Sequence, residues 1–234
     1  ANIQYLNDLV ELSMTLGDIE RQLGDSQAAR STYARAAEAV SRAIELNPSD
    51  NLLPALLVRA KDHEGRAHAD LHENDDAIND LRAAVEKGGA ELKSPAANEF
   101  CRGYLTESLW DLGRSLREKG QTADAAKLDE ERADLWRNRP TDELLALASR
   151  EAASANIIGY GNTTLEPAGQ VIHEVELQRA VETLRQALAQ DPGAIDKLKS
   201  DLNLAPLLEQ ATGNADGGSA NAPKRSIGQA NSSP

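Results

Sequence analysis

Cysteine and aromatic residues are scarce in this chain. Cys101 is the single cysteine, so no disulfide can form within the chain, and aromatics make up 3% of its 234 residues. No apolar run is long enough to cross a membrane, and no signal peptide is recognisable. These absences exclude a disulfide scaffold, and we expect a cytoplasmic protein with no membrane-inserted segment.

Basic residues are outnumbered by acidic ones. The 38 Asp and Glu residues exceed the 25 Lys and Arg residues, which gives a formal net charge of −13. Such a charge disfavours nucleic acids and anionic membranes as partners. The sequence is rich in Ala, Leu, Glu and Arg, which are strong helix formers, so we expect an all-α protein whose core is built from Ala and Leu.

Small residues recur at a fixed interval of 48 positions. Gly17, Gly65 and Gly113 are related by this step, and so are Ala29, Ala77 and Ala125. In the first copy, Leu16-Gly17, Gly24, Ala29, Tyr33 and Ala36 have the spacing of a helical hairpin in which small residues allow two helices to approach closely. This spacing resembles the tetratricopeptide (TPR) repeat, although 48 residues exceed the usual 34. The resemblance implies a TPR-like right-handed superhelix of extended hairpins.

The repeats and the turn signals predict three regions. We expect three extended hairpins over residues 1–140, an irregular fourth hairpin with a capping helix over 141–210, and a disordered tail over 211–234. The predicted helices of the first region span 1–23, 26–46, 52–72, 75–87, 97–119 and 122–138, with Gly88-Gly89 ending the fourth.

Residues 124–209 carry a second resemblance. The residues concerned are Leu135-Trp136, Pro140, Glu143-Leu144-Leu145, Ala148, Gly159-x-Gly161, Leu165, Ala180-x-x-x-Leu184-Arg185-x-Ala187 and Asp201-Leu202-x-Leu204-x-Pro206-Leu207. They resemble the C-terminal TPR region of planctomycete serine/threonine protein kinases, which implies a regulatory region of such a kinase. Asp191-Pro192-Gly193 departs from that pattern, and the chain has no Gly-rich phosphate loop, His-Arg-Asp or Asp-Phe-Gly motif, so we expect no catalysis here. Because the chain begins at Ala1 without Met, we also expect a fragment or a processed product.

The first helix of each hairpin carries a stripe of charged and bulky residues. In TPR arrays these stripes line the concave groove, where Arg can hold carboxylates or phosphates and Trp can hold an apolar side chain. We therefore predict a non-enzymatic scaffold that binds a protein or peptide, acidic or phosphorylated, at Met14, Asp18, Arg21, Arg59, Asp62, Arg66, Trp110, Arg114 and Arg117. The alternative is that these Arg residues pair with nearby Asp residues on a solvated face.

Three histidines, His63, His68 and His72, crowd one predicted helix and raise the alternative of a metal-dependent enzyme. His68 and His72 are four residues apart, as a metal-binding pair would be, but His63-Glu64 and His68 miss the His-Glu-x-x-His spacing by one residue. We expect structural or solvated histidines, with no metal and no cofactor. Cys101 is interpreted as a core residue, and Gly159-Tyr160-Gly161 as a loop between helices.

Overall fold

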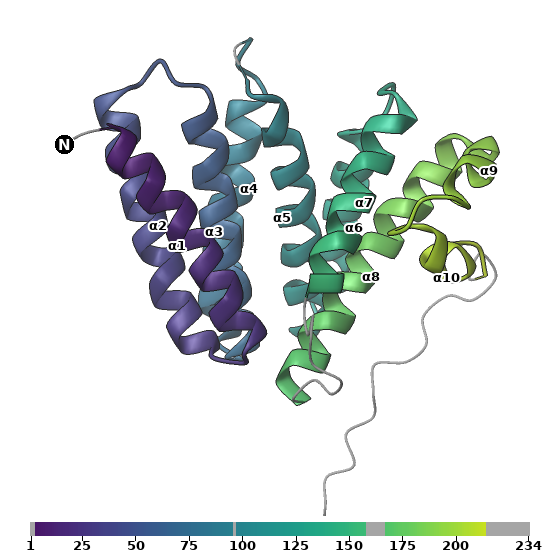
Figure 1. Ribbon diagram of the computed structural model, residues 1–234, viewed down its shortest axis with the longest axis horizontal. Helices are drawn as coiled ribbons and strands as arrows, with labels where there is room; N and C mark the ends of the chain where they lie inside the picture. The colour runs from purple at the N-terminus through teal and green to yellow at the C-terminus, as the bar shows by residue number, and fades with distance from the viewer. Residues whose placement is uncertain (1–2, 96, 158–166, 214–234) are drawn as a thin grey trace, which may run out of the picture.

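The computed structural model describes residues 3–95, 97–157 and 167–213, and all regular structure in these ranges is helical (Figure 1). The long helices are α1 (Ile3–Gln22), α2 (Ser26–Leu46), α3 (Leu52–Asp70), α4 (Asn74–Glu91), α5 (Glu99–Glu118), α6 (Thr122–Asp134), α7 (Thr141–Ile157) and α8 (Pro167–Gln190). Short helical turns follow at η1 (Pro192–Ala194), α9 (Ile195–Leu198), η2 (Ala205–Leu207) and α10 (Leu208–Thr212). The prediction of an all-α protein is confirmed for these residues.

Each helix from α1 to α5 packs against the next one along the chain, as α7 does against α8, and α3 also contacts α5. Within each of the first two hairpins, the two helices approach each other closely at a glycine. Gly17 of α1 faces the ring of Tyr33 on α2, and Gly65 of α3 faces Leu81 on α4. Tyr33 and Leu81 are wholly buried, so the absence of a side chain on one helix makes room for a large side chain on its partner.

Local signals explain where helices begin. The carboxylate of Asp25 accepts a hydrogen bond from the backbone N–H of Ala28 at 2.9 Å, which caps α2. The side chain of Asn98 caps α5 in the same way, through the N–H of Phe100 at 3.0 Å. Side-chain caps thus satisfy donors that a helix start leaves unpaired.

Several predicted helix bounds are wrong. The fourth helix does not end at Gly88-Gly89 but continues to Glu91, and the sixth ends at Asp134 because residues 135–138 form turns. The predicted capping segment after Ile195 is broken into α9, η2 and α10. The predicted tail begins inside α10, since Ala211 is buried; residues 214–234 lie outside the described residues.

Helices α7 to α10 share an apolar cluster with Trp136, which follows α6. The indole N–H of Trp136 donates to Thr106 of α5 at 2.9 Å, and Arg102 of α5 donates to the carbonyl of Leu135 at 2.7 Å. These bonds join the last helices to the third hairpin. Among the described residues, no helix combines the length and the apolar character needed to cross a bilayer.

Candidate functional site

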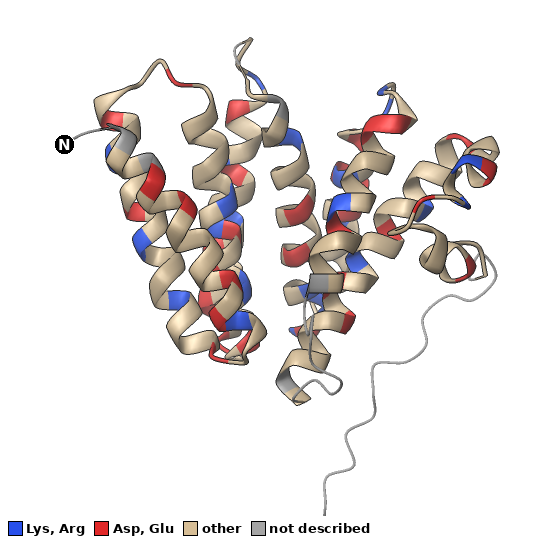
Figure 2. Ribbon diagram, viewed as in Figure 1, with Lys and Arg blue, Asp and Glu red and all other residues tan. Residues whose placement is uncertain are grey.

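The first helices of the three hairpins, α1, α3 and α5, each form side-chain ion pairs with α8. Figure 2 shows where charged residues lie along these helices. We call the α1, α3 and α5 surfaces that point toward α8 the inner face. Glu176 of α8 accepts hydrogen bonds from Arg21 of α1 at 2.9 Å and from Arg66 of α3 at 3.1 Å. One carboxylate of α8 therefore joins two arginines of the inner face.

Arg179, one turn beyond Glu176 on α8, extends these contacts to two more helices. It donates to Asp111 of α5 at 3.0 Å and lies 3.4 Å from Glu151 of α7, and it also pairs with Glu176. The resulting buried ion network contains the guanidinium groups of Arg21, Arg66 and Arg179 and the carboxyl groups of Asp62, Glu107, Asp111, Glu151 and Glu176.

Carboxyl groups outnumber guanidinium groups in this network, and the pKa values reflect the imbalance. Burial and the neighbouring carboxylates Asp111 and Glu107 raise the pKa of Asp62 to about 7, against the opposing effect of Arg66. Burial and Glu107 likewise raise the pKa of Glu151 to about 7. Burial alone would raise the pKa of Glu176, but Arg179, Arg66 and Arg21 hold it well below its usual value. Glu176 is thus the ionised centre of the network.

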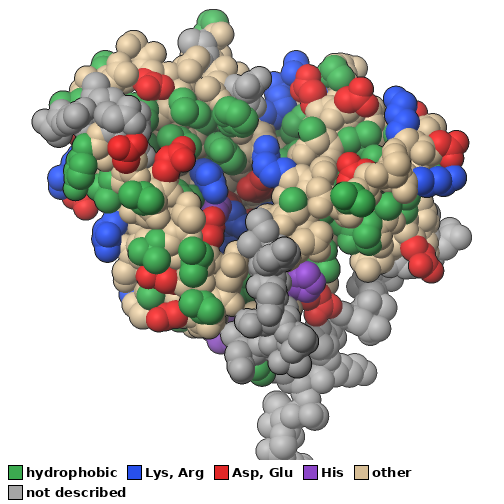
Figure 3. Space-filling view, in the orientation of Figure 1, with side chains coloured by type: hydrophobic (Ala, Val, Ile, Leu, Met, Phe, Trp, Pro, Cys, Tyr) green, Lys and Arg blue, Asp and Glu red, His purple; other side chains and the backbone are tan. Residues whose placement is uncertain are grey.

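An open cleft lies beside the network, bounded by α1, α3, α5, α7 and α8. This inner cleft has a volume of about 460 Å³, and the space-filling view shows basic and acidic side chains inside the hollow (Figure 3). Tyr104 lies in its wall close to two arginines, with Arg59 at 5.8 Å and Arg150 at 5.9 Å from the ring centre. Arg59 and Arg150 keep 34% and 47% of their side-chain surface exposed. They are the accessible cations of this cleft's wall.

A hydrogen-bonded group of three side chains lies at the α1 side of the inner cleft. Asp18 accepts from the hydroxyl of Tyr33 at 2.7 Å and lies 3.0 Å from Nδ1 of His63. Burial would raise the pKa of Asp18, but His63, Tyr33 and Arg59 together lower it. Burial and the nearby Arg66 lower the pKa of His63 to about 4. Near pH 7 the carboxylate of Asp18 is therefore ionised and accepts hydrogen bonds, while the imidazole of His63 is neutral.

The nine predicted groove residues lie in different surroundings. Met14 is buried in the apolar core of the first hairpins, and Asp62, Arg21 and Arg66 are buried in the ion network. Asp18 and Arg59 line the inner cleft. The remaining residues, Trp110, Arg114 and Arg117, lie farther along α5; Trp110 and Arg117 line a different cleft, and Arg114 pairs with Glu118.

Sequence reasoning missed the residues that α7 and α8 bring to this site. Glu176 and Arg179 are three residues apart, which on a helix is the spacing of an ordinary surface ion pair. Nothing in that spacing shows that both side chains are buried. Tyr104 and Arg150 were also missed, because neither belongs to the stripe at 48-residue spacing.

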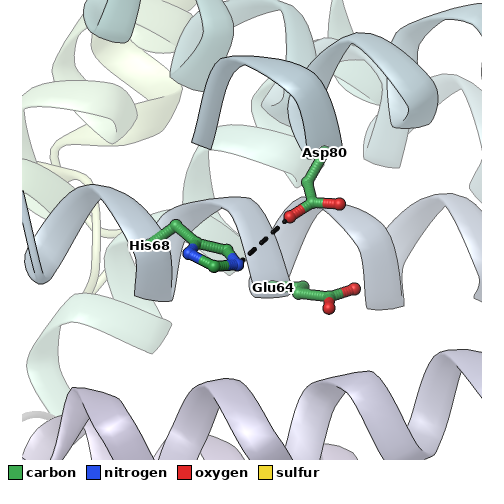
Figure 4. A group of neighbouring side chains, drawn as sticks. All are labelled: Glu64, His68 and Asp80. Atoms are coloured by element: carbon green, nitrogen blue, oxygen red, sulfur yellow. Dashed lines mark ion pairs between the residues drawn. The ribbon is translucent and has the colours of Figure 1, made fainter. Parts of the chain in front are cut away.

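The three histidines of the metal hypothesis do not converge. His63 faces Asp18, His72 is exposed in the turn after α3, and His68 lies near carboxylates. Figure 4 shows His68 with Glu64 and Asp80, the imidazole Nε2 lying 3.4 Å from Asp80. Lys61 supplies a cation to this group, because its ammonium lies 2.7 Å from Glu64 and 3.6 Å from Asp80.

Cys101 is buried, and burial raises the pKa of its thiol to about 11. At neutral pH the thiol is therefore protonated, which makes it a poor nucleophile.

In comparisons with protein-family models, with curated proteins and with solved structures, nothing matches this chain.

Proposed function

We propose that this protein is a non-enzymatic, TPR-like helical scaffold whose inner face binds an acidic segment of a peptide or partner protein. The helix bounds support the repeat: α1, α3 and α5 end at Gln22, Asp70 and Glu118, and the next helices begin at Ser26, Asn74 and Thr122. Both sets of bounds recur every 48 residues. The connecting turns also contain left-handed residues at this spacing, namely Gly24, His72 and Gly120.

One observation carries the proposal: the inner face already holds a helix of its own chain through Arg–carboxylate pairs. Arg21 and Arg66 both bind Glu176 of α8. Beside this contact, the inner cleft presents Arg59 and Arg150, both next to the ring of Tyr104. Arg59 lies 3.8 Å from the carboxylate of Asp18, so its guanidinium retains donors for another acceptor. The same chemistry that holds α8 can thus hold an acidic residue of a partner.

The proposal is tested by selecting ligands from a phage-displayed library of random dodecapeptides on the intact protein. The affinities of the selected peptides are then measured by fluorescence anisotropy. For peptides that use the inner cleft, we expect Arg59→Glu with Arg150→Glu to weaken binding at least about tenfold, since each lost charged hydrogen bond contributes roughly 1.5–3 kcal/mol. Arg59 pairs with Asp18, and Arg150 donates to Glu107 at the edge of the ion network. Both guanidinium groups are nevertheless partly exposed, so we expect helicity measured by circular dichroism to stay unchanged.

The matched control is Arg35→Glu with Arg42→Glu, which changes the net charge equally on the exposed side of α2. This control should bind the peptides as the unaltered protein does. Recovery of no peptide, or equal loss of binding in both double variants, would contradict the proposal. Arg66 is unsuitable for this test because its substitution would disturb the buried network.

A further inference from the structure

Four arginines are buried in the described part of the chain, and one of them has no carboxylate partner. Arg21, Arg66 and Arg179 each form ion pairs with two or more acidic residues. Arg132 of α6 is 5% exposed, and no described carboxylate lies within 4.0 Å of its guanidinium. Its Nη2 donates to the hydroxyl of Thr183 at 2.6 Å, while its Nε has no hydrogen-bond partner.

Arg132 lines a cleft of about 1140 Å³ between α5, α6, α8 and α10, which we call the Arg132 cleft. Two other arginines of the same cleft already have partners. Arg117 pairs with Asp129, and Arg185 lies 3.1 Å from Glu182 and donates to the carbonyl of Gln210 at 2.8 Å. The positive charge that lacks a counter-ion in this cleft is therefore that of Arg132.

The charges of the cleft wall favour a singly charged ligand. Asp129, Glu182 and Glu209 line the cleft together with the three arginines. A carboxylate would balance the one unpaired guanidinium, whereas a phosphate dianion would add a second negative charge beside these three acids. Trp110 and Val181 give the cleft an apolar wall, which suits a large apolar side chain next to the carboxylate.

A buried cation without a counter-ion is unfavourable for the folded protein. Burial lowers the pKa of Arg132, and the attraction of Glu151 and Glu182 does not compensate. A ligand carboxylate would remove this penalty when it binds, because it supplies the missing acceptor in a largely desolvated position.

We propose that the Arg132 cleft binds an Asp or Glu side chain of a peptide partner, with Arg132 as its counter-ion and a neighbouring apolar residue of the peptide against Trp110. This inference rests on the proposed function and names a recognition subsite for it, separate from Arg59 and Arg150. The sequence pattern did not indicate the subsite, because Arg132 falls where the repeat has Ala36 and Ala84.

The probes are the dodecapeptides selected on the intact protein, together with versions in which each Asp or Glu is replaced by Asn or Gln. We expect the selected sequences to be enriched in an acidic residue next to a large apolar one. Replacing that acidic residue should weaken binding about tenfold or more. Arg132→Gln should weaken the unmodified peptide equally, and the two changes together should cost no more than either alone.

Arg42→Gln is the matched control, because Arg42 is 65% exposed and its partner Glu38 lies on the same helix. It should leave every affinity unchanged. Phosphoserine in place of the acidic residue should bind more weakly than the carboxylate. Because the peptide substitutions act on unaltered protein, they remain informative even where Arg132→Gln fails to fold.

The inference would be overturned by selected peptides without acidic enrichment, or by peptide affinities that do not change when the carboxylate is removed. Independent, additive effects of the peptide change and Arg132→Gln would overturn it as well. Binding that depends on Arg59 and Arg150 but not on Arg132 would overturn the subsite while leaving the proposed function in place. Recovery of no peptide would overturn both.

Discussion

The interiors of the first two hairpins and the contact between the inner face and α8 are held by opposite chemistry. Within the hairpins, Gly17 and Gly65 receive Tyr33 and Leu81 in an apolar core. Between the inner face and α8, Arg66 and Arg179 bind buried carboxylates. Each of α1 and α3 thus packs one face closely against its hairpin partner and binds α8 through ion pairs on another face.

The two kinds of contact are sensitive to different substitutions. A close-packed apolar contact fails when volume is added or removed. A buried ion network fails when one partner is removed, because the remaining charges stay in a poorly solvated place. Helix α8 packs on α7 through apolar side chains, but its contact with the inner face, and with it the shape of the inner cleft, depends on the second kind of contact.

The largest effect is expected from Arg179→Met. This change leaves Asp111, Glu151 and Glu176 without the guanidinium that joins them. We expect the free energy of unfolding to fall by about 3–5 kcal/mol in urea titrations. The control Arg42→Met removes an exposed ion pair and should cost less than about 1 kcal/mol. Similar losses in the two variants would show that the network does not hold α8.

The apolar side of the comparison is tested by adding single methyl groups at glycines. At Gly65 a Cβ would lie 2.7 Å from Cγ of Leu81, and at Gly17 it would overlap the ring of Tyr33. We expect Gly65→Ala and Gly17→Ala to destabilise the protein by about 1–3 kcal/mol, measured by thermal and urea unfolding.

Gly89→Ala is the matched control, because it lies within α4 and a Cβ there would meet nothing within 4 Å. It should stabilise the protein by roughly 0.5–1 kcal/mol through helix propensity. A loss of stability at Gly89 equal to that at Gly65 would mean that close packing is not the cause.

The stability contributed by the buried ion network should depend on pH. In the folded protein the pKa of Glu151 is raised to about 7, so between its ordinary pKa and 7 the folded state holds a proton that the unfolded state has lost. This contribution to stability is present at low pH and is lost as the pH rises through 7. The amide in Glu151→Gln does not titrate, so this variant does not lose stability in that way as the pH rises. The same reasoning applies to Asp62→Asn.

We therefore expect each variant to gain stability relative to the unaltered protein between pH 5 and pH 8, by on the order of 1–2 kcal/mol. Urea unfolding at both pH values measures this difference. His63, whose pKa is lowered to about 4, contributes stability that is lost as the pH falls below its ordinary pKa. That contribution is common to both proteins and cancels in the comparison. A difference that stays constant with pH would contradict the raised pKa values.

The all-α fold was predictable because strong helix formers dominate the sequence, and the residues of the first hairpin contact were predictable because they leave a spacing pattern. Gly17 and Tyr33 are found by spacing alone, since small and large residues must alternate where helices touch. The buried network left no such pattern. Glu176 and Arg179 have the spacing of a solvated pair, and only the path of α8 across the inner face shows that they are buried. The break between α9 and α10 has a local cause that was missed: Asp201 accepts hydrogen bonds from the backbone N–H groups of Asn203 and Leu204, and Pro206 follows.

The smallest effect is expected in the turns that connect the hairpins. Gly24, His72 and Gly120 all have left-handed backbone angles, with φ of 83°, 62° and 77°. A side chain in this conformation costs about 1 kcal/mol, and His72 is the one of the three that has one. Its side chain is exposed, so His72→Gly should lose few contacts and should stabilise the protein by roughly 0.5–1 kcal/mol. Gly120→Ala should destabilise it by a similar amount, since its Cβ would meet nothing within 4 Å and backbone strain alone would act. Urea unfolding of the two variants should therefore give changes of opposite sign, and changes of the same sign would show that these turns do not share one conformational requirement.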